Sequence, residues 1–456
     1  MVAVELKDDL VKNILLVTVD SLRFDDLQRS SVETTAIDAL VDNGVAFERA
    51  FATGPGTTPS FPALLTGTMP LSYDGLGPLS EYRPRVSSNL SNAGFTTAGF
   101  HSNPFLSSHF AYDIGFDTFE DYQNPLMGIA TKVFPRGIEL DGSLNRLNEH
   151  LHLTDFLKWS YQKIRGKPRP YVPAEVITDD AKKWLENTDE PFLCWAHYMD
   201  VHQPCYPPAK YRERFGVGDV DQKTAAELYS RSISDPQSIT DEERNTHRCL
   251  ADAALAFTDA QVDRILNTLR EQNRYKDTLV VFTSDHGHLY GDHKQFGKPE
   301  MLYEELLRIP LVVANGPDHL EFAQRDLVSL LDVPPLIFNA LNLPIPKKFT
   351  GLRPGIDESR HHVIAEHEVE GEVIVGARSE NWRYEHDQIR GERRLFDLNE
   401  SCTGIQVDEK SIRSDDEIDR IRSAVAERLD SLDVDATGYD KIDENVQDRL
   451  TELGYF

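Results

Sequence analysis

One segment decides the fold class of this chain: Leu279-Val280-Val281-Phe282-Thr283-Ser284-Asp285-His286-Gly287. Its first four residues are apolar, as is typical of a strand buried on both faces of a parallel sheet. Two side chains that can ligate metal, Asp285 and His286, follow the strand, and Gly287 permits an unusual backbone conformation. Ligands of open α/β sheets bind beyond the carboxyl ends of the strands. The segment therefore predicts an α/β protein with a functional site after this strand.

Three further apolar runs have the same character, at residues 11–19, 192–196 and 309–313. Between them lie segments with the apolar periodicity of a helix. The clearest runs from Leu250 to Leu269, with apolar residues on one face. Strands that alternate with helices are typical of an α/β core. We therefore expect a mixed, mostly parallel sheet sandwiched by helices.

The pattern changes after Pro354, where short strand-like pieces follow one another at 362–365, 373–376 and 394–397. These predict a small antiparallel sheet, and Ile418, Ile421, Val425 and Leu429 mark an acidic amphipathic helix after it. We divide the chain into a catalytic α/β domain at 1–354 with a helical insertion at 125–171, a C-terminal antiparallel subdomain at 355–405, and an acidic helical segment at 406–456.

The charge of the chain is strongly negative: 76 acidic against 48 basic residues give a net charge of −28. Such a balance argues against nucleic acid as a partner. It is also typical of adaptation to high salt, where the Debye length falls to roughly 3 Å at 1 M and removes mutual repulsion. We favour this interpretation and expect a halophilic source. We find neither a run of about 18 apolar residues nor a signal peptide, so we expect a cytoplasmic protein without a transmembrane segment.

Two more segments place chemically capable side chains near the predicted strand ends. Asp20 closes the first strand, where a carboxylate is well placed for a metal, although many strands end in a turn aspartate. Thr57 lies in a Gly/Pro loop before a short helix that runs to Gly67, with Pro59 expected in its first turn. There a hydroxyl can serve an oxyanion site, or can simply cap the helix.

Histidines follow the second apolar run. His197 and His202 flank Asp200, and such a histidine could donate to a tetrahedral anion or protonate a leaving alkoxide. The segment after His286 is also rich in donors, with His293 and Lys298. Carboxylate oxygen with imidazole suits Mn²⁺, Mg²⁺ or Zn²⁺, whereas Ca²⁺ prefers oxygen ligands alone.

Taken together, these segments resemble the sulfatases of the alkaline phosphatase superfamily. The similarity covers nearly the whole chain in the right order, and the fourth of its blocks is the most specific. The blocks are similar to the opening strand, the nucleophile helix, the histidine- and proline-containing loop, and the metal and substrate block of that family, at 13–27, 57–67, 197–208 and 283–313.

The resemblance implies an alkaline-phosphatase-like fold and a divalent metal ion. It implies that Asp20, Asp285 and His286 are metal ligands and that Thr57 is the nucleophile, also touching the metal. His202 and Lys298 are similar to residues that contact the transferred group or the leaving oxygen. For substrate binding we expect His197, Asn103 and His293.

Three departures from the family pattern affect the expected chemistry. Sulfatases carry Cys or Ser, followed by Pro and Arg, so that the first residue becomes formylglycine; here Thr57 and Phe61 stand at the first and last positions, so no formylglycine is expected. At the position where the family usually has a second acidic ligand, this chain has Ser21. The family's Gly-Lys-Trp-His segment corresponds to about 101–104, where Asn103 is a candidate substitute.

These departures leave two functions open. The first is a metal-dependent hydrolase of sulfuric or phosphoric esters, or a phosphotransferase, because a threonine ester must be released by attack on phosphorus or sulfur. The missing basic residues favour the second, a catalytically degenerate member that binds a sulfated or phosphorylated glycan. The retained Thr57, Lys298 and Asp285-His286 oppose it.

Overall fold

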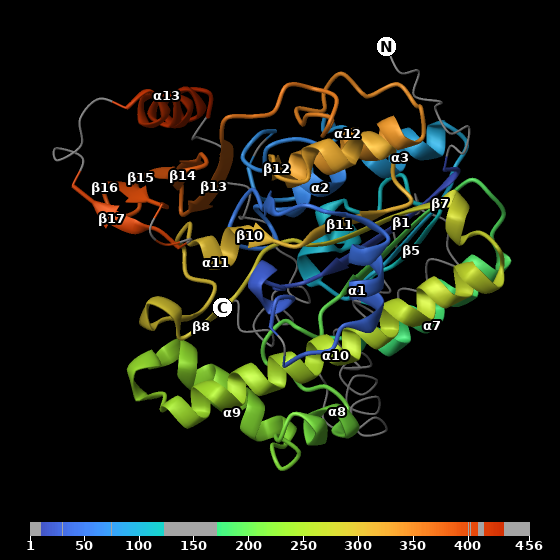
Figure 1. The fold of residues 1–456 in the computed structure, drawn as a ribbon, viewed down its shortest axis with the longest axis horizontal. Coiled ribbons are helices and arrows are strands. Elements are labelled where there is room, and N and C mark those ends of the chain that lie inside the picture. The colour runs from blue at the N-terminus through green and yellow to red at the C-terminus, as the bar shows by residue number, and fades with distance from the viewer. Residues whose placement is uncertain are drawn as a thin grey trace, which may run out of the picture.

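The computed structural model describes residues 11–29, 31–73, 75–122, 171–399, 401, 403–408 and 415–432. Its largest element is a seven-stranded sheet in the order β2-β11-β7-β1-β6-β4-β5, with helices on both faces (Figure 1). In that order the strands are Gly44–Ala46, Leu311–Ala314, Thr278–Ser284, Asn13–Val19, Phe192–Tyr198, Thr96–Phe100 and Thr118–Glu120. This arrangement confirms the predicted α/β class.

Strand β1 lies in the middle of the sheet and pairs in parallel with β6 and β7. Every residue of these three strands is buried, which accounts for their continuously apolar sequences. Val19 is level with Tyr198 of β6 on one side and with Ser284 of β7 on the other. The three strands therefore end side by side at one edge of the sheet.

The apolar run at 309–313 differs from the prediction, because it forms two strands. Arg308–Ile309 is β10, which joins β3 (Arg49–Phe51) and β12 (Leu327–Ser329) in a separate sheet. Pro310 interrupts the run because it has no N–H to donate to a strand ladder. The second strand, β11, pairs antiparallel with β7 and with β2, so the main sheet is mixed and mostly parallel.

The two faces of the sheet carry different sets of helices. Leu15 and Val17 of β1 share a core with α1, α7 and α10, whereas Ile14 and Leu16 point to α2, α3 and α12. These helices are Thr35–Asp42, Ala174–Asn187, Asp241–Glu271, Phe61–Thr66, Val86–Asn92 and Val333–Ala340. The predicted helix at 250–269 is part of α10, which begins at a capping box formed by Thr240 and Glu243.

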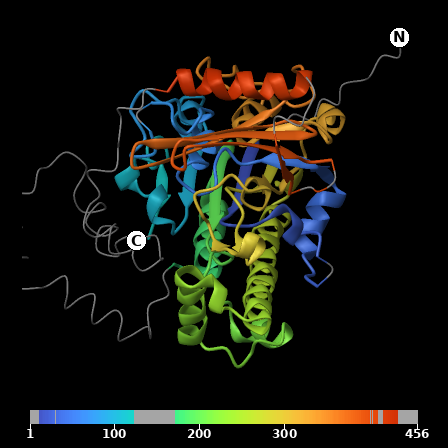
Figure 2. The same ribbon diagram turned by 90° about the vertical axis from the view of Figure 1, so that its left-hand side faces the viewer.

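A five-stranded antiparallel sheet follows, as the strand pieces after Pro354 predicted, with two strands more than expected, β15 and β17. The amphipathic helix α13 (Asp416–Asp430) packs Ile418, Ile421 and Val425 against this sheet, and Figure 2 shows it lying across the sheet's outer face. Strands β13 to β17 are Val363–Val369, Glu372–Arg378, Trp382–Asp387, Glu392–Asp397 and Ile405–Val407.

The C-terminal sheet contacts the main body through a buried apolar cluster that includes Ile374 of β14 and Phe51 of β3, and through polar groups. Arg383 of β15 pairs with Glu304 in α11 at 3.4 Å, and both side chains are buried. On β13, the Glu366 N–H donates to the Thr53 carbonyl at 2.8 Å.

The proposed domain boundaries remain predictions, and the insertion at 125–171 lies almost wholly outside the described residues. The remaining elements are α8 (Ala209–Arg214), α9 (Gln222–Ser234), α11 (Glu304–Leu307), β8 (Leu289–Tyr290) and β9 (Phe296–Gly297).

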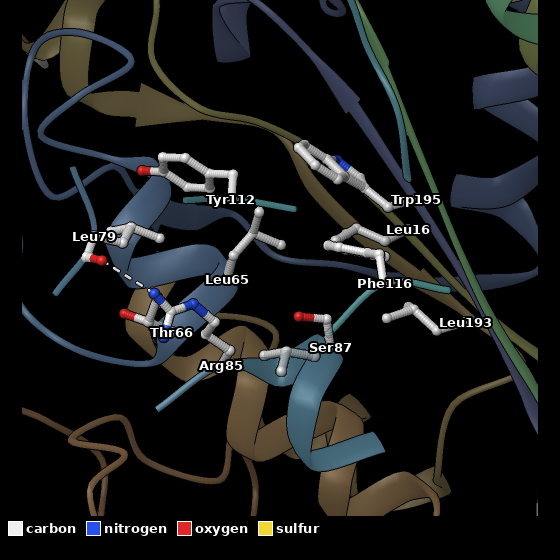
Figure 3. A pocket seen from close by; sticks show the side chains of 11 residues that line it. Leu16, Leu65, Thr66, Leu79, Arg85, Ser87, Tyr112, Phe116, Leu193 and Trp195 are labelled. Carbon is white, nitrogen blue, oxygen red and sulfur yellow. Dashed lines mark hydrogen bonds between the residues drawn. The ribbon is translucent and has the colours of Figure 1, made fainter. Parts of the chain in front are cut away.

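A small cavity of about 10 Å³ lies in the core between α2 and the sheet (Figure 3). It is lined by Leu65 of α2, Leu16 of β1 and Trp195 of β6, and by Arg85, whose guanidinium donates to the Leu79 carbonyl at 3.1 Å. Its volume is about that of one water position. The cavity is therefore a gap in core packing, too small to bind an organic substrate.

Among the described helices, none is long and apolar enough to cross a membrane.

Candidate active site

The candidate site lies where β1 and β7 end. Asp20 follows β1, and Asp285 and His286 follow β7, whose last residue is level with Val19. The parallel register thus brings together side chains that are 265 residues apart in sequence. All three are completely buried, and one ligand atom from each lies within 4.8 Å of the others.

The orientation of His286 suits a metal. Its Nδ1 lies 2.7 Å from the Gly287 carbonyl, which can only accept, so Nδ1 carries the proton. The lone pair of Nε2 then faces Asp285 Oδ2 at 3.4 Å and Asp20 Oδ1 at 3.7 Å. Because lone pairs from two carboxylates and an imidazole converge here, the group fits a divalent cation.

The pKa values of this group follow from burial and mutual charge. Burial raises the pKa of Asp285 well above its usual value, and the neighbouring Asp20 adds to the effect. Burial also opposes ionisation of Asp20, but His202, His197 and Lys298 outweigh it and hold its pKa well below the usual value. Burial lowers the pKa of His286 to about 3, so the ring is neutral. The carboxylate of Asp20 is thus ionised, whereas that of Asp285 needs a nearby cation to ionise.

Thr57 lies at the centre of the group. Its Oγ1 is 3.1 Å from Asp285 Oδ2 and 3.4 Å from both Asp20 Oδ2 and His286 Nε2. Ser60, and not Thr57, is the N-cap residue of α2. The helix begins at Phe61, so Pro59 precedes its first turn, contrary to the prediction. Capping therefore does not account for Thr57.

The loop around Thr57 is held by its own side chains. The Thr53 hydroxyl donates to the Pro59 carbonyl at 2.8 Å, and the Ser60 hydroxyl donates to the Gly54 carbonyl at 3.0 Å. Gly54 is closely surrounded: a Cβ there would lie 2.3 Å from Pro59 and 2.6 Å from the Glu366 carbonyl oxygen. The loop therefore presents Thr57 in one fixed position.

Asn103 and His197 also join the group. Asn103 Nδ2 donates to Asp20 Oδ2 at 2.8 Å and lies 3.4 Å from Thr57 Oγ1. His197 Nε2 is 3.5 Å from Asp20 Oδ2. On its other side, Nδ1 contacts the Thr18 hydroxyl at 2.9 Å, which accepts from Trp195 Nε1 at 3.0 Å. The Thr18 hydroxyl can donate to Nδ1, which leaves the proton of His197 on Nε2, facing Asp20.

Lys298 and His202 form a direct pair, with 2.9 Å between Nζ and Nε2. Burial lowers the pKa of His202 to about 3, and the charge of Lys298 adds to this, so His202 is neutral and accepts from the ammonium group. Burial also lowers the pKa of Lys298, although the carboxylates of Asp20 and Asp285 oppose the shift. A proton held at Lys298 Nζ is thus available beside the carboxylates.

Ser21 and His293 have other contacts. Ser21, where sulfatases usually have an acidic ligand, donates its hydroxyl to Asp20 Oδ1 at 2.7 Å and its N–H to Asp285 Oδ1 at 3.3 Å, with a positive φ of 64°. It therefore orients both carboxylates. His293 Nε2 lies 3.1 Å from Glu305 Oε1, and its ring stacks on Tyr303, so its substrate-binding role remains a prediction.

Sequence reasoning missed several neighbours of the group, including Thr18, Trp195 and His288. Thr18 and Trp195 stand beside predicted site residues, but nothing in their sequence separates them from other buried strand residues. His288 is buried two residues after His286. Its position two residues after the predicted ligand His286 was the signal in the sequence that could have identified it.

Comparison with known proteins identifies the family of this chain. A family model described as Sulfatase matches residues 12–343. The chain is 25% identical over 388 residues to the uncharacterized sulfatase YidJ of Escherichia coli, covering 79% of this chain and 71% of that protein. It is 23% identical to an arylsulfatase of Clostridium perfringens, covering 94% and 97%.

Among solved structures, a phosphonate monoester hydrolase of Agrobacterium radiobacter has a similar fold. Its TM-score is 0.65 at 20% identity, with 95% of this chain and 98% of that chain covered. That likeness shows the alkaline-phosphatase-like fold. The family match over residues 12–343 shows that this chain belongs to the sulfatase family and is an ester hydrolase of the sulfatase and phosphatase type.

Proposed function

We propose that this chain is a metal-dependent hydrolase of phosphoric esters, or a phosphotransferase, in which Thr57 is the nucleophile. One observation carries the proposal: Thr57 Oγ1 lies 3.1 Å from Asp285 Oδ2 and 3.4 Å from Asp20 and His286, at the point where the candidate metal ligands converge. A hydroxyl held among such ligands is activated as a nucleophile.

The residue at position 57 favours phosphate over sulfate. A formylglycine hydrate releases sulfate by collapsing to its aldehyde, which threonine cannot do. Phe61, where the formylglycine pattern has arginine, is completely buried, with its ring centroid 5.0 Å from that of His197, and so offers no charge to a substrate. An ester on Thr57 must be released by attack on its central atom, which is the established course for phosphoryl enzymes.

Asp20, Asp285 and His286 would hold the metal ion, with Mn²⁺, Mg²⁺ and Zn²⁺ as the candidates for this ligand set. Such an ion would neutralise charge on the nonbridging oxygens and favour the ionised form of the Thr57 hydroxyl. The buried carboxylates supply the matching negative charge.

The chain's own side chains account for the proton transfers. The Thr57 hydroxyl donates to Asp285 Oδ2, which can take its proton as the bond from Oγ1 to phosphorus forms and the bond from phosphorus to the leaving oxygen breaks. Lys298 Nζ holds a proton for that leaving oxygen, and His202 orients the ammonium. Water, or an acceptor alcohol, then attacks phosphorus as the bond from phosphorus to Thr57 Oγ1 breaks; its proton passes to Lys298 Nζ, and Asp285 returns its proton to Oγ1.

The test compares Thr57→Ala with Thr57→Ser and with Thr58→Ala, a half-buried neighbour. Each variant is assayed with p-nitrophenyl phosphate, a phosphate diester and p-nitrophenyl sulfate, in Mn²⁺, Mg²⁺ or Zn²⁺. We expect Thr57→Ala to lower kcat by about 10³-fold or more while retaining metal, Thr57→Ser to keep measurable activity, and Thr58→Ala to match the wild type.

Full activity of Thr57→Ala would remove Thr57 as the nucleophile. Faster turnover of the sulfate than of either phosphate would reverse the proposed preference. If the wild type neither turns over any of the three esters nor binds metal, the chain is a degenerate member that binds an anionic glycan.

A further inference from the structure

Thr18 connects strand β1 to the histidine that faces Asp20. Thr18 of β1 and His197 of β6 are level in the parallel ladder, so their side chains lie on the same face of the sheet, and both are completely buried. The Thr18 hydroxyl oxygen is 2.9 Å from His197 Nδ1 and 3.0 Å from Trp195 Nε1. These are the only side-chain hydrogen bonds of Thr18 in the part of the chain that the structure describes.

The direction of these two hydrogen bonds follows from the chemistry of the groups. An indole N–H can only donate, so the Thr18 oxygen accepts from Trp195, and the Thr18 proton has His197 Nδ1 as its acceptor. If Nδ1 carried the ring proton instead, the buried Thr18 hydroxyl would lose its acceptor. The lone pair of Nε2 would then also face the Asp20 carboxylate, 3.5 Å away. Both effects keep the proton of the ring on Nε2.

The Nε2–H of His197 faces the point where Asp20 and the proposed nucleophile meet. Nε2 is buried and has no hydrogen-bond partner among the described residues. Its neighbour Asp20 Oδ2, at 3.5 Å, is itself 3.4 Å from Thr57 Oγ1. Phe61 packs against the ring with 5.0 Å between centroids and an angle of 87°, which holds its orientation. Because a buried donor without a partner is costly, we expect a bound ligand to supply an acceptor here.

We propose that Thr18 is a positioning residue for the transfer reaction: its hydroxyl keeps the proton of His197 on Nε2, where it can donate to a nonbridging oxygen of the bound phosphate group. Trp195 supports this by donating to the Thr18 oxygen, so that the hydroxyl proton points to His197. A substrate contact of His197 is predicted from the sequence; the structure adds the two residues that prepare it. The inference rests on the proposed function, because it takes the group transferred to Thr57 to be phosphoryl.

The test compares Thr18→Val, which has nearly the same shape without the hydroxyl, with Thr18→Ser, which retains it. The matched control is Thr283→Val. Thr283 is level with Thr18 on β7 and equally buried, but its hydroxyl donates to the Pro310 carbonyl at 2.8 Å and not to a histidine. Its replacement therefore removes a buried hydrogen bond from the same layer of the sheet without touching His197.

The protonated nitrogen of His197 can be observed directly. In protein labelled with ¹⁵N-histidine and loaded with Zn²⁺ or Mg²⁺, the ¹⁵N shifts of a ring distinguish its protonated from its unprotonated nitrogen, and His197→Gln assigns the signals. We expect a proton on Nε2 in the wild type, Thr18→Ser and Thr283→Val, and a mixture of the two tautomers in Thr18→Val.

Calorimetric titration with inorganic phosphate and turnover of p-nitrophenyl phosphate measure the consequence. We expect Thr18→Val to weaken phosphate binding and to lower kcat, each about tenfold, since the donor of one hydrogen bond to the phosphate group is no longer held in place. Thr18→Ser and Thr283→Val should stay within about twofold of the wild type in both measurements.

A wild-type ring protonated on Nδ1 would overturn the inference, whether or not Thr18→Val folds. Equal losses of phosphate binding in Thr18→Val and Thr283→Val, or an unchanged tautomer in Thr18→Val, would overturn it as well. If the wild type turns over no phosphate ester, the proposed function fails. A changed tautomer together with weaker phosphate binding in Thr18→Val would then still support the positioning role.

Discussion

Glu366 and Arg428 form an ion pair with two hydrogen bonds that joins helix α13 to strand β13: Arg428 Nε lies 2.6 Å from Glu366 Oε2, and Nη2 lies 2.9 Å from Oε1. The same carboxylate accepts from the Leu71 N–H at 2.6 Å, while the Glu366 N–H donates to the Thr53 carbonyl. Thr53 in turn holds the loop that carries Thr57. Glu366 thus contacts helix α13 through its carboxylate and the nucleophile loop through its backbone N–H.

Replacing this carboxylate should destabilise the protein. For Glu366→Ala we expect the free energy of unfolding to fall by about 3–5 kcal/mol, because Arg428 and the Leu71 N–H lose their buried partner. Urea denaturation measures this. The control is Glu33→Ala, which breaks an exposed pair with Arg214 and should cost about 1 kcal/mol or less. Equal losses in the two variants would contradict the proposed role of Glu366.

Metal content should depend on the converging ligands alone. We expect Asp285→Ala and His286→Ala to be purified with little bound metal and no turnover, because each removes one of three ligands. Thr57→Ala and His293→Ala should retain the wild-type stoichiometry, since His293 pairs with Glu305. Elemental analysis after dialysis measures this. Loss of metal in His293→Ala would extend the site beyond the three ligands.

Lys298 should set the alkaline limit of activity. Its protonated ammonium is the proposed acting form and its pKa is lowered from 10.5 by burial. Therefore kcat should fall as the pH rises through that lowered value, before free lysine would lose its proton. Lys298→Ala should reduce kcat by about 10²–10³-fold, and Lys298→Arg should lose the alkaline limb, because arginine stays charged.

The matched control for the pH profile is Lys294→Ala, at an exposed lysine between β8 and β9. It should keep both kcat and the alkaline limb of the wild type. An unchanged alkaline limb in Lys298→Arg would assign the limb to another group.

We propose that the net charge of −28 is an adaptation to high salt, which predicts stabilisation by salt. Raising KCl from 0.1 to 2 M should raise Tm, because screening shortens the Debye length from about 10 Å to below about 3 Å and relieves repulsion among carboxylates. Differential scanning calorimetry measures this. A Tm that stays constant or falls over this range would count against adaptation to high salt.

The sequence predicted the strands that build the site better than it predicted their pairing. Asp20 and Asp285 were identified because each ends a continuously apolar run, and the parallel order of those runs brings them together. The direction of β11 was not readable, since a fully buried antiparallel strand has the same apolar pattern as a parallel one. Strand β15 was missed because four of its six residues, Arg383, Glu385, His386 and Asp387, are polar. Yet Arg383, Glu385 and Asp387 are buried among charge partners.

The site residues also differ in how well the sequence predicted them. Thr57, Asn103 and Lys298 were predicted from a family resemblance in which each occupies a definite place in a local motif. Glu366 has no such motif, because its importance depends on contacts between segments distant in the sequence. The Lys298–His202 pair was likewise invisible, since its two members are 96 residues apart.

The central position of β1 has a consequence for the order in which this protein can mature. Its partners β6 and β7 begin about 180 and 265 residues later in the chain, so a nascent chain that leaves the ribosome carries β1 as an apolar strand with two unsatisfied edges. Long-range pairing of this kind is slow and exposes the chain to aggregation. Asp20 and Asp285 are also 265 residues apart in the chain, so the proposed metal ion could bind to both only after translation has passed most of the chain.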